Sequence, residues 1–135
     1  MPKSPADAKA KTATEANSEV NTHGGGCHCG KVRYEMTAKV EKVISCNCSI
    51  CMKSGALLTM FPAAQFKLTS GADNLIDYQS NKHAIHHMVC SDCGVKSFAT
   101  AAGPDGTPMV AVNVRCLDDI DLKALSIIEF DGRSR

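Results

Sequence analysis

The pattern of apolar and polar positions predicts a domain built mostly from β-strands. Between residues 31 and 36, Val32, Tyr34 and Met36 alternate with polar residues, which is the period of a strand with one buried face. Similar short runs predict further strands at residues 42–45, 57–61, 75–79, 84–89, 95–100, 109–114 and 126–130. Because no rhythm of strands and long helices is present, the predicted fold class is mostly antiparallel β.

Turn and cap residues divide these runs. The sequences SGAD (70–73), SNK (80–82) and GPDG (103–106) supply the Gly, Asn and Asp residues that hairpin turns require. Two short helical segments are predicted, one after Cys48 that ends near Gly55, and one over residues 121–125 behind an Asp cap. Residues 1–23 lack an apolar stripe, so they are predicted to be a disordered tail before a domain at residues 24–135.

The composition indicates that the fold needs a stabilising element besides its hydrophobic core. Only 4% of the residues are aromatic and Trp is absent, so few large side chains can fill a core. Eight cysteines are present. The N-terminal segment has no apolar signal region and no run is long enough to span a membrane, so we expect a cytoplasmic protein whose thiols bind metal rather than form disulfides.

Charge gives little indication of a large partner. The formal net charge is +1, and Lys and Arg are scattered without a basic run. Nucleic acid and membrane surfaces are therefore not expected as partners, and the oligomeric state cannot be derived from the sequence.

Four cysteines have the spacing of a structural zinc site. Cys27 and Cys29 lie in CHCG, and Cys90 and Cys93 lie in CSDCG. Each pair is followed by Gly, which allows a tight turn that brings backbone N–H groups to the sulfurs. Four thiolates close a tetrahedral zinc site and leave no position for substrate, although disulfides or unrelated buried thiols are the alternative.

Three more thiols lie in CNCSIC at Cys46, Cys48 and Cys51. Three protein ligands with an open fourth position are the pattern of a catalytic zinc, and the amides of the short helix that follows would stabilise thiolate charge. The alternative is a closed site, completed by Cys116, His86 or His87. Cys116 is equally well interpreted as a plain buried thiol.

The segments GGCHCGKVRYE, CNCSICMKSGAL, CSDCG and VNVRCLDD resemble the family named for the glutathione-dependent formaldehyde-activating enzyme, which also includes the domain of centromere protein V. The chain is similar to its short bacterial members, called aldehyde-activating proteins. The resemblance implies a β-tent fold, two zinc ions per chain, and a carbon–sulfur lyase activity that forms or cleaves S-hydroxymethylglutathione. It also implies structural zinc on Cys27, Cys29, Cys90 and Cys93, and the second, catalytic zinc on Cys46, Cys48 and Cys51.

Two hypotheses of function follow. In the first, the chain is an enzyme that acts on a small thiol or a thiol–aldehyde adduct, glutathione among them, with Lys53 or Arg115 as the cation near the open site and His86 or His87 as a weak candidate base. In the second, both zinc sites are structural and the domain is a non-catalytic binding module. A thiol redox or metal sensor ranks behind both, because the two metal sites leave no isolated redox pair.

Overall fold

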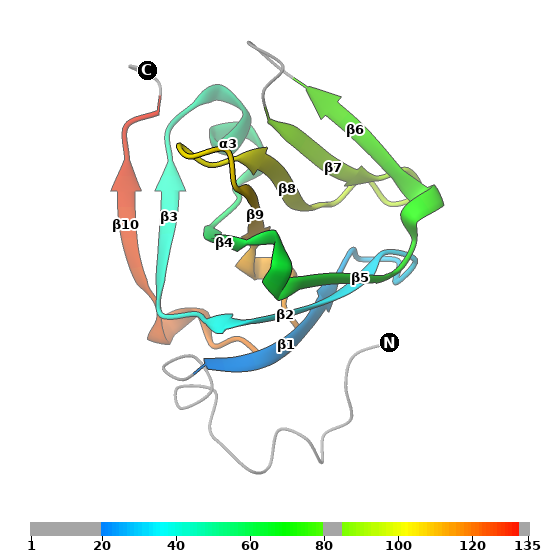
Figure 1. Ribbon diagram of the computed structural model, residues 1–135, viewed down its shortest axis with the longest axis horizontal. Helices are drawn as coiled ribbons and strands as arrows, with labels where there is room; N and C mark the ends of the chain where they lie inside the picture. The colour runs from blue at the N-terminus through cyan, green and yellow to red at the C-terminus, as the bar shows by residue number, and fades with distance from the viewer. Residues whose placement is uncertain (1–19, 80–84, 133–135) are drawn as a thin grey trace.

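The computed structural model describes residues 20–79 and 85–132, in which ten strands form two sheets (Figure 1). The small sheet has the order β1-β2-β5, and the large sheet has the order β10-β3-β4-β9-β8-β7-β6. The strands of the small sheet are β1 Val20–Gly26, β2 Arg33–Lys39 and β5 Phe66–Ser70. Those of the large sheet are β3 Lys42–Cys46, β4 Leu58–Pro62, β6 Leu75–Gln79, β7 His86–Cys90, β8 Lys96–Ala102, β9 Pro108–Asn113 and β10 Ser126–Phe130.

The predicted fold class is confirmed. Among the described strands every pairing is antiparallel except that of β10 with β3. One short α-helix, α3 Ser49–Ser54, lies in this part of the chain, together with the 3-10 turns Ala63–Gln65, Ala72–Asn74, Val114–Cys116 and Leu122–Ala124. The fold is therefore a mostly β arrangement of two sheets.

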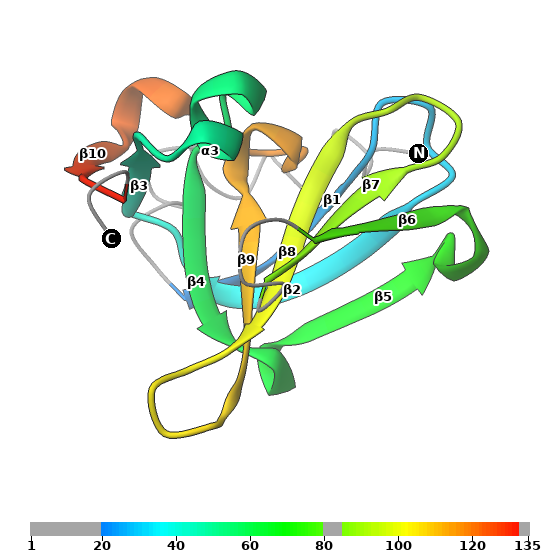
Figure 2. The same cartoon turned by 90° about the horizontal axis from the view of Figure 1, so that it is seen from above.

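The core lies where the small sheet packs on the large one, as the view from above shows (Figure 2). Phe66 of β5 is in ring contact with Tyr34 of β2 and Phe98 of β8, at centroid distances of 5.1 and 4.8 Å. Tyr34 and Phe98 meet edge to face at 5.6 Å. Three of the six aromatic residues of the chain thus meet at one junction, where their large apolar surface helps to hold the sheets together, whereas Tyr78 and Phe130 are exposed.

Eight of these strands correspond to the eight predicted from the pattern, with shifted ends in most cases. Two predictions fall partly or wholly outside the described residues: Ala84 at the start of the β7 prediction, and the turn at 80–82. Both helical predictions are confirmed. Helix α3 ends at Gly55 with a φ of 72°, and the side chain of Asp121 caps the single turn Leu122–Ala124 by accepting a hydrogen bond from the Lys123 amide.

Strands β1 and β5 were not predicted. Strand β1 begins at Val20, so the ordered domain starts inside the segment that was assigned to the tail, while residues 1–19 lie outside the described residues. Its run of glycines was placed at the start of the predicted domain and not in a strand, but these residues permit close backbone approach. A Cβ at Gly25 would lie 2.8 Å from the Cys116 carbonyl oxygen, and one at Gly26 would lie 2.0 Å from that of Val32.

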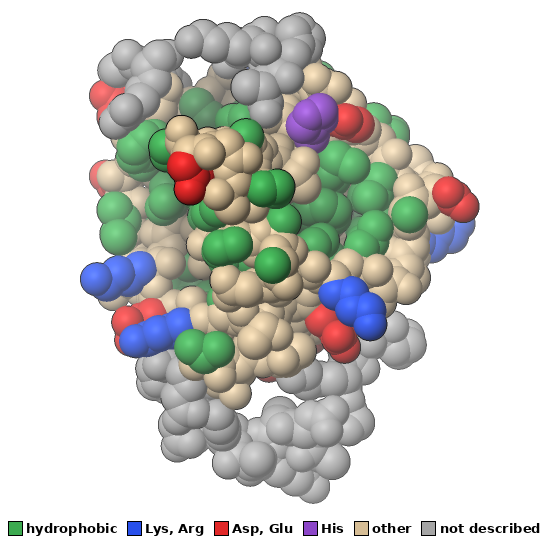
Figure 3. All heavy atoms as spheres, in the orientation of Figure 1, with side chains coloured by type: hydrophobic (Ala, Val, Ile, Leu, Met, Phe, Trp, Pro, Cys, Tyr) green, Lys and Arg blue, Asp and Glu red, His purple; other side chains and the backbone are tan. Residues whose placement is uncertain are grey.

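The structure also shows the length of its helices and the distribution of charged side chains on one face. No helix in residues 20–79 or 85–132 has the length and apolar character needed to cross a membrane. On the face in Figure 3, the Lys and Arg side chains lie near the rim, each close to an acidic side chain, and hydrophobic side chains occupy much of the space between them. The basic residues on this face therefore do not form a continuous patch.

Candidate metal centres

The first four-thiol group, hereafter the four-cysteine cluster (Cys27, Cys29, Cys90 and Cys93), forms where two turns meet. One pair lies in the turn between β1 and β2, and the other spans the end of β7 and the turn into β8. All four Sγ atoms lie within 4.8 Å of one another. The Sγ atom of Cys29 is 3.6 Å from that of Cys27 and 3.7 Å from that of Cys90. A tetrahedron with metal–sulfur bonds of about 2.3 Å has edges of about 3.8 Å, so the donor set fits zinc.

Backbone amides support thiolate charge in this cluster, as the glycine after each pair led us to expect. Gly30 and Gly94 have φ values of 86° and 78°. The amide of Val32 donates to the Cys27 sulfur at 3.3 Å, and the amide of Asp92 donates to the Cys90 sulfur at 3.4 Å. Burial alone would raise the pKa of Cys93, but the amides of Val95 and Cys29 outweigh it and lower that pKa to about 6.

The second group, hereafter the three-cysteine cluster (Cys46, Cys48 and Cys51), lies on one tight segment. Cys46 ends β3, Cys48 is the N-cap of α3 and Cys51 lies inside the helix, with the three Sγ atoms within 4.8 Å of one another. The Cys48 amide donates to the Cys46 sulfur at 3.5 Å.

The start of α3 favours one thiolate in this cluster but not three. Burial raises the pKa of Cys48, yet the backbone N–H groups of Cys51 and Ile50, with the neighbouring thiols, bring it below its ordinary value. Burial, followed by the neighbouring Cys48, raises the pKa of Cys51 to about 12. Three thiolates at this spacing therefore require a cation among them, which is what a metal-binding site supplies.

The end of β10 packs directly on this cluster. The amide of Asn47 donates to the carbonyl oxygen of Phe130 at 3.1 Å, and the Asn47 side chain donates to the Asp131 carboxylate at 3.0 Å. A Cβ atom at Gly132 would lie 2.4 Å from the Cys46 sulfur, much closer than van der Waals contact allows. Position 132 therefore needs glycine so that the chain can lie against the cluster.

The Gly132→Ala variant is expected to lose affinity for metal at the three-cysteine cluster. The added methyl group would displace the Cys46 sulfur, and such disturbance around a ligand typically lowers metal affinity by about 10–100-fold. The measurement is chelator competition on the purified variant, compared with Gly103→Ala. At Gly103 the new Cβ would meet mainly the flexible Met109 side chain, at 3.2 Å. Equal affinities in the two variants would contradict this interpretation of Gly132.

None of the proposed fourth ligands joins the three-cysteine cluster. In the part of the chain that the structure describes, no fourth His, Cys, Asp or Glu ligand atom groups with its three sulfurs. His86 is partly exposed and lies 2.8 Å from the Asp77 carboxylate, whereas His87 is buried. Cys116 lies beside the four-cysteine cluster, with which it lines a pocket. Among the described residues, the arrangement thus offers three protein ligands.

Comparison with known families gives the wider context of this arrangement. Residues 22–128 match the sequence model of the family described as glutathione-dependent formaldehyde-activating enzyme, which is well over half of the chain. The chain belongs to the glutathione-dependent formaldehyde-activating enzyme family. Among solved structures, a crystal structure of a Rhodobacter sphaeroides protein matches with a TM-score of 0.66 and 24% sequence identity, over 78% of this chain and 99% of that one. The second likeness shows a shared fold, and the first confirms the resemblance noted in the sequence.

In this formaldehyde-activating enzyme family member, the cations expected near the open position are both at the surface. Lys53 and Arg115 are exposed. A different lysine, Lys96, is only 8% exposed, and its Nζ atom has no hydrogen-bond partner in the described protein. Burial lowers the pKa of Lys96, while the thiols of Cys51 and Cys48 act in the opposite direction. Lys96, unlike Lys53 and Arg115, is therefore a buried charge within electrostatic reach of the three-cysteine cluster.

Sequence reasoning missed Lys96 because of an irregularity in the strand pairing. Strict alternation would place Lys96 and Phe98 on the same face of the strand. The register shifts here, since Val89 pairs with Lys96 but its neighbour Met88 pairs with Phe98. The extra residue, Ser97, breaks the period of two. The one available signal was a charged residue in the otherwise apolar and small run VKSFAT.

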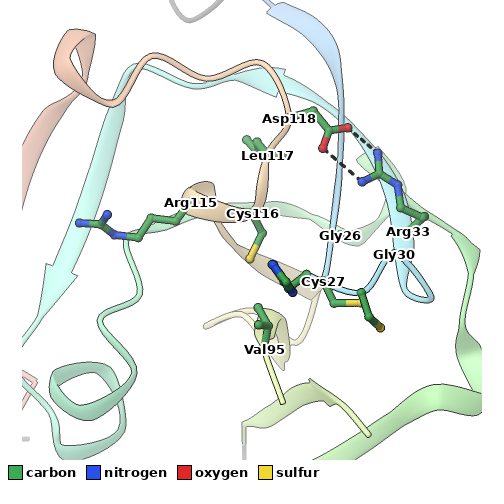
Figure 4. Close-up of a pocket in the computed structure, with 11 residues that line it drawn as sticks. Gly26, Cys27, Gly30, Arg33, Val95, Arg115, Cys116, Leu117 and Asp118 are labelled. Atoms are coloured by element: carbon green, nitrogen blue, oxygen red, sulfur yellow. Dashed lines mark hydrogen bonds and ion pairs between the residues drawn. The ribbon is translucent and has the colours of Figure 1, made fainter. Parts of the chain in front are cut away.

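A pocket of about 360 Å³ lies beside the four-cysteine cluster, between the Cys27–Gly30 turn and residues 115–118 (Figure 4). Arg33 and Asp118 form a two-point ion pair in its wall, with one of the hydrogen bonds at 3.1 Å. Burial, followed by the nearby cluster thiols, raises the pKa of Cys116 to about 11, so that this thiol stays protonated near neutral pH. None of the three-cysteine cluster lines this pocket, so the pocket and that cluster are separate features of the structure.

Proposed function

We propose that this protein is a zinc-dependent carbon–sulfur lyase-type enzyme that forms or cleaves thiol–aldehyde adducts, with S-hydroxymethylglutathione as the expected type of substrate. The observation that carries the proposal is the three-cysteine cluster, which offers three thiol ligands on one helix start without a fourth protein ligand among the described residues. Membership of a formaldehyde-activating family supports aldehyde chemistry at this position.

The two clusters are assigned different roles. The four-cysteine cluster has a complete set of thiol ligands with tetrahedral spacing, so it would hold a structural zinc ion. Bound at the three-cysteine cluster, zinc would supply a Lewis-acid contact for the sulfur or oxygen of the substrate. Thiol donors are soft, which suits zinc and the exchange of a soft ligand such as a second thiol.

The residues around the three-cysteine cluster hold its thiols in place and stabilise their charge. Backbone N–H groups at the start of α3 stabilise the charge on Cys48, and the segment from Phe130 to Gly132 lies against Cys46 and fixes the loop that carries it. Residues that are held in this way lose little further freedom when a substrate binds. We place the protein in the cytoplasm, where reduced thiols and a thiol substrate would both be present.

The activity is tested by comparison with the unassisted reaction, since thiols add to formaldehyde without an enzyme. The rate of exchange between formaldehyde plus glutathione and their adduct is measured by NMR, with and without the zinc-loaded protein. We expect acceleration that is lost when the three-cysteine cluster is emptied and returns when zinc is restored. If the exchange rate is the same with and without the protein when both clusters are loaded with zinc, the proposal is contradicted and the binding-module hypothesis is favoured.

A further inference from the structure

Lys96 has an environment that its position in the core does not explain. It is the first residue of β8, it is 8% exposed, and its Nζ atom has no hydrogen-bond partner among the described residues. No ion pair in this part of the chain includes it. A buried ammonium group without a partner is strongly disfavoured, so a lysine kept in such a position suggests a role in binding.

The backbone of Lys96 is linked through Asn113 to the segment that follows helix α3. The Asn113 side chain, itself 8% exposed, donates to the carbonyl oxygen of Lys96 at 3.2 Å and accepts from the amide of Leu57 at 3.3 Å. Leu57 lies shortly after the end of α3. Asn113 therefore ties the start of β8 to the chain that leaves the cluster, and the thiols of Cys51 and Cys48 are the opposing charges that act on Lys96.

His87 is a second buried polar residue near Lys96. It lies on β7, the strand that pairs with β8, is 5% exposed, and has an Nδ1 atom without a hydrogen-bond partner among the described residues. Burial lowers the pKa of His87, and the charge of Lys96 lowers it further, although Asp77 acts in the opposite direction. Asp77 itself is hydrogen bonded to His86 at the surface. The imidazole is thus a neutral neighbour and places no second positive charge beside Lys96.

We propose that Lys96 contacts the substrate, and that its ammonium group donates a hydrogen bond to the oxygen atom of the thiol–aldehyde adduct held at the three-cysteine cluster. This inference rests on the proposed function. When the adduct forms, the thiol sulfur gives an electron pair to the carbonyl carbon, the C=O π pair moves to oxygen, and the proton lost by the thiol ends on that oxygen. Cleavage is the reverse, and the lysine is unchanged in both directions.

The advantage of a lysine here is electrostatic. Negative charge on the oxygen is largest while the C–S bond is partly formed, so a fixed ammonium group stabilises the transition state more than either the free aldehyde or the neutral adduct. The Nζ atom of Lys96 is shielded from water, which strengthens such an interaction. An exposed lysine such as Lys53 would not provide it.

The first test compares Lys96→Met with the matched control Lys53→Met, which removes an exposed lysine two residues after Cys51. With both metals bound, we expect Lys96→Met to lower kcat by about 100–1000-fold and to change KM less, while Lys53→Met retains the wild-type values. Metal content and thermal unfolding are measured on both variants. Lys96→Met should keep two metals and an unfolding midpoint at or above that of the wild type, because it removes an unpaired buried charge. A wild-type kcat in Lys96→Met would overturn the inference.

The second test needs no turnover and also separates this inference from the proposed function. Mercaptoacetate carries an anionic oxygen close to its sulfur, as the reacting adduct does, and ethanethiol is its counterpart without oxygen. By calorimetry on the zinc-loaded proteins, Lys96→Met and Lys96→Gln should bind mercaptoacetate at least tenfold more weakly than the wild type, with ethanethiol unaffected. Equal binding of mercaptoacetate by all three proteins would overturn the contact. A wild-type protein that shows this Lys96-dependent binding but no adduct turnover would support the contact and contradict the lyase proposal.

Discussion

The Cys90→Ser variant is expected to lose the cooperative unfolding transition of the domain, or to unfold at a midpoint at least 15 °C lower, when zinc is present in excess. Cys90 is 1% exposed and belongs to the four-cysteine cluster, which joins the β1–β2 turn to the β7–β8 turn. Structural zinc contributes apparent binding energies of about 10–16 kcal/mol, whereas small domains have total stabilities of about 5–15 kcal/mol. Without this site, the sparse aromatic core would have to hold the two sheets alone.

The measurement is thermal unfolding followed by circular dichroism, on the wild type, Cys90→Ser and Cys116→Ala. Cys116 lies beside the same cluster but is not one of its ligands, so its replacement controls for the loss of a partly buried thiol. Chelator added to the wild type should reproduce the effect of Cys90→Ser. A Cys90→Ser protein that unfolds at the wild-type midpoint would show that the four-cysteine cluster does not stabilise the fold.

The Cys48→Ser variant is expected to remain folded and to lose at least 1000-fold in the rate of adduct exchange. Cys48 is only half-buried, and its cluster lies on a single local segment, so the cluster does not connect distant parts of the two sheets. A serine hydroxyl is a poor ligand for zinc at neutral pH, and removal of a ligand from a three-thiolate site should empty it. The number of bound metals should fall from two to one per chain.

Metal content, unfolding and exchange rate are measured together on this variant, with Ser49→Ala as the control. Ser49 is the next residue along the chain, is exposed, and supplies no ligand to the cluster. Two results would contradict the division of roles between the clusters. One is a Cys48→Ser protein that keeps its activity with a single bound metal, and the other is one that unfolds as completely as Cys90→Ser.

The candidate metal centres could be predicted from the sequence because their information is local. Cysteines one to three positions apart can share a metal only on a tight turn, and Gly30, Gly94 and Gly55 mark those turns. Assigning Cys90 and Cys93 as partners of Cys27 and Cys29 was harder, since it depends on how the two sheets meet. Coordination chemistry supported this assignment, because the two cysteine pairs together complete one tetrahedral set of four thiol ligands.

The features that were missed depend on contacts between distant parts of the chain. The glycines of β1 have little strand propensity by themselves, yet β1 pairs along its whole length with β2, and Gly25 also bridges to Leu117. The burial of Lys96 coincides with a register shift against β7, and the side-chain alternation of one strand cannot reveal such a shift. The same holds for Gly132. This position requires a residue without a side chain because the Cys46 sulfur, far away in the sequence, lies against it.

The spacing of the four-cysteine cluster has a consequence for how members of such a family can diverge. Cys29 and Cys90 are 61 positions apart, and the whole three-cysteine cluster lies in the chain between them. The entropy of closing a loop grows only slowly with length, by about 0.6 kcal/mol for each doubling. Insertions or deletions in the loops of this enclosed segment would thus have little effect on the stability of the four-cysteine cluster at its two ends. Evolution can remodel the surroundings of the reactive position while the anchoring thiols keep the same architecture.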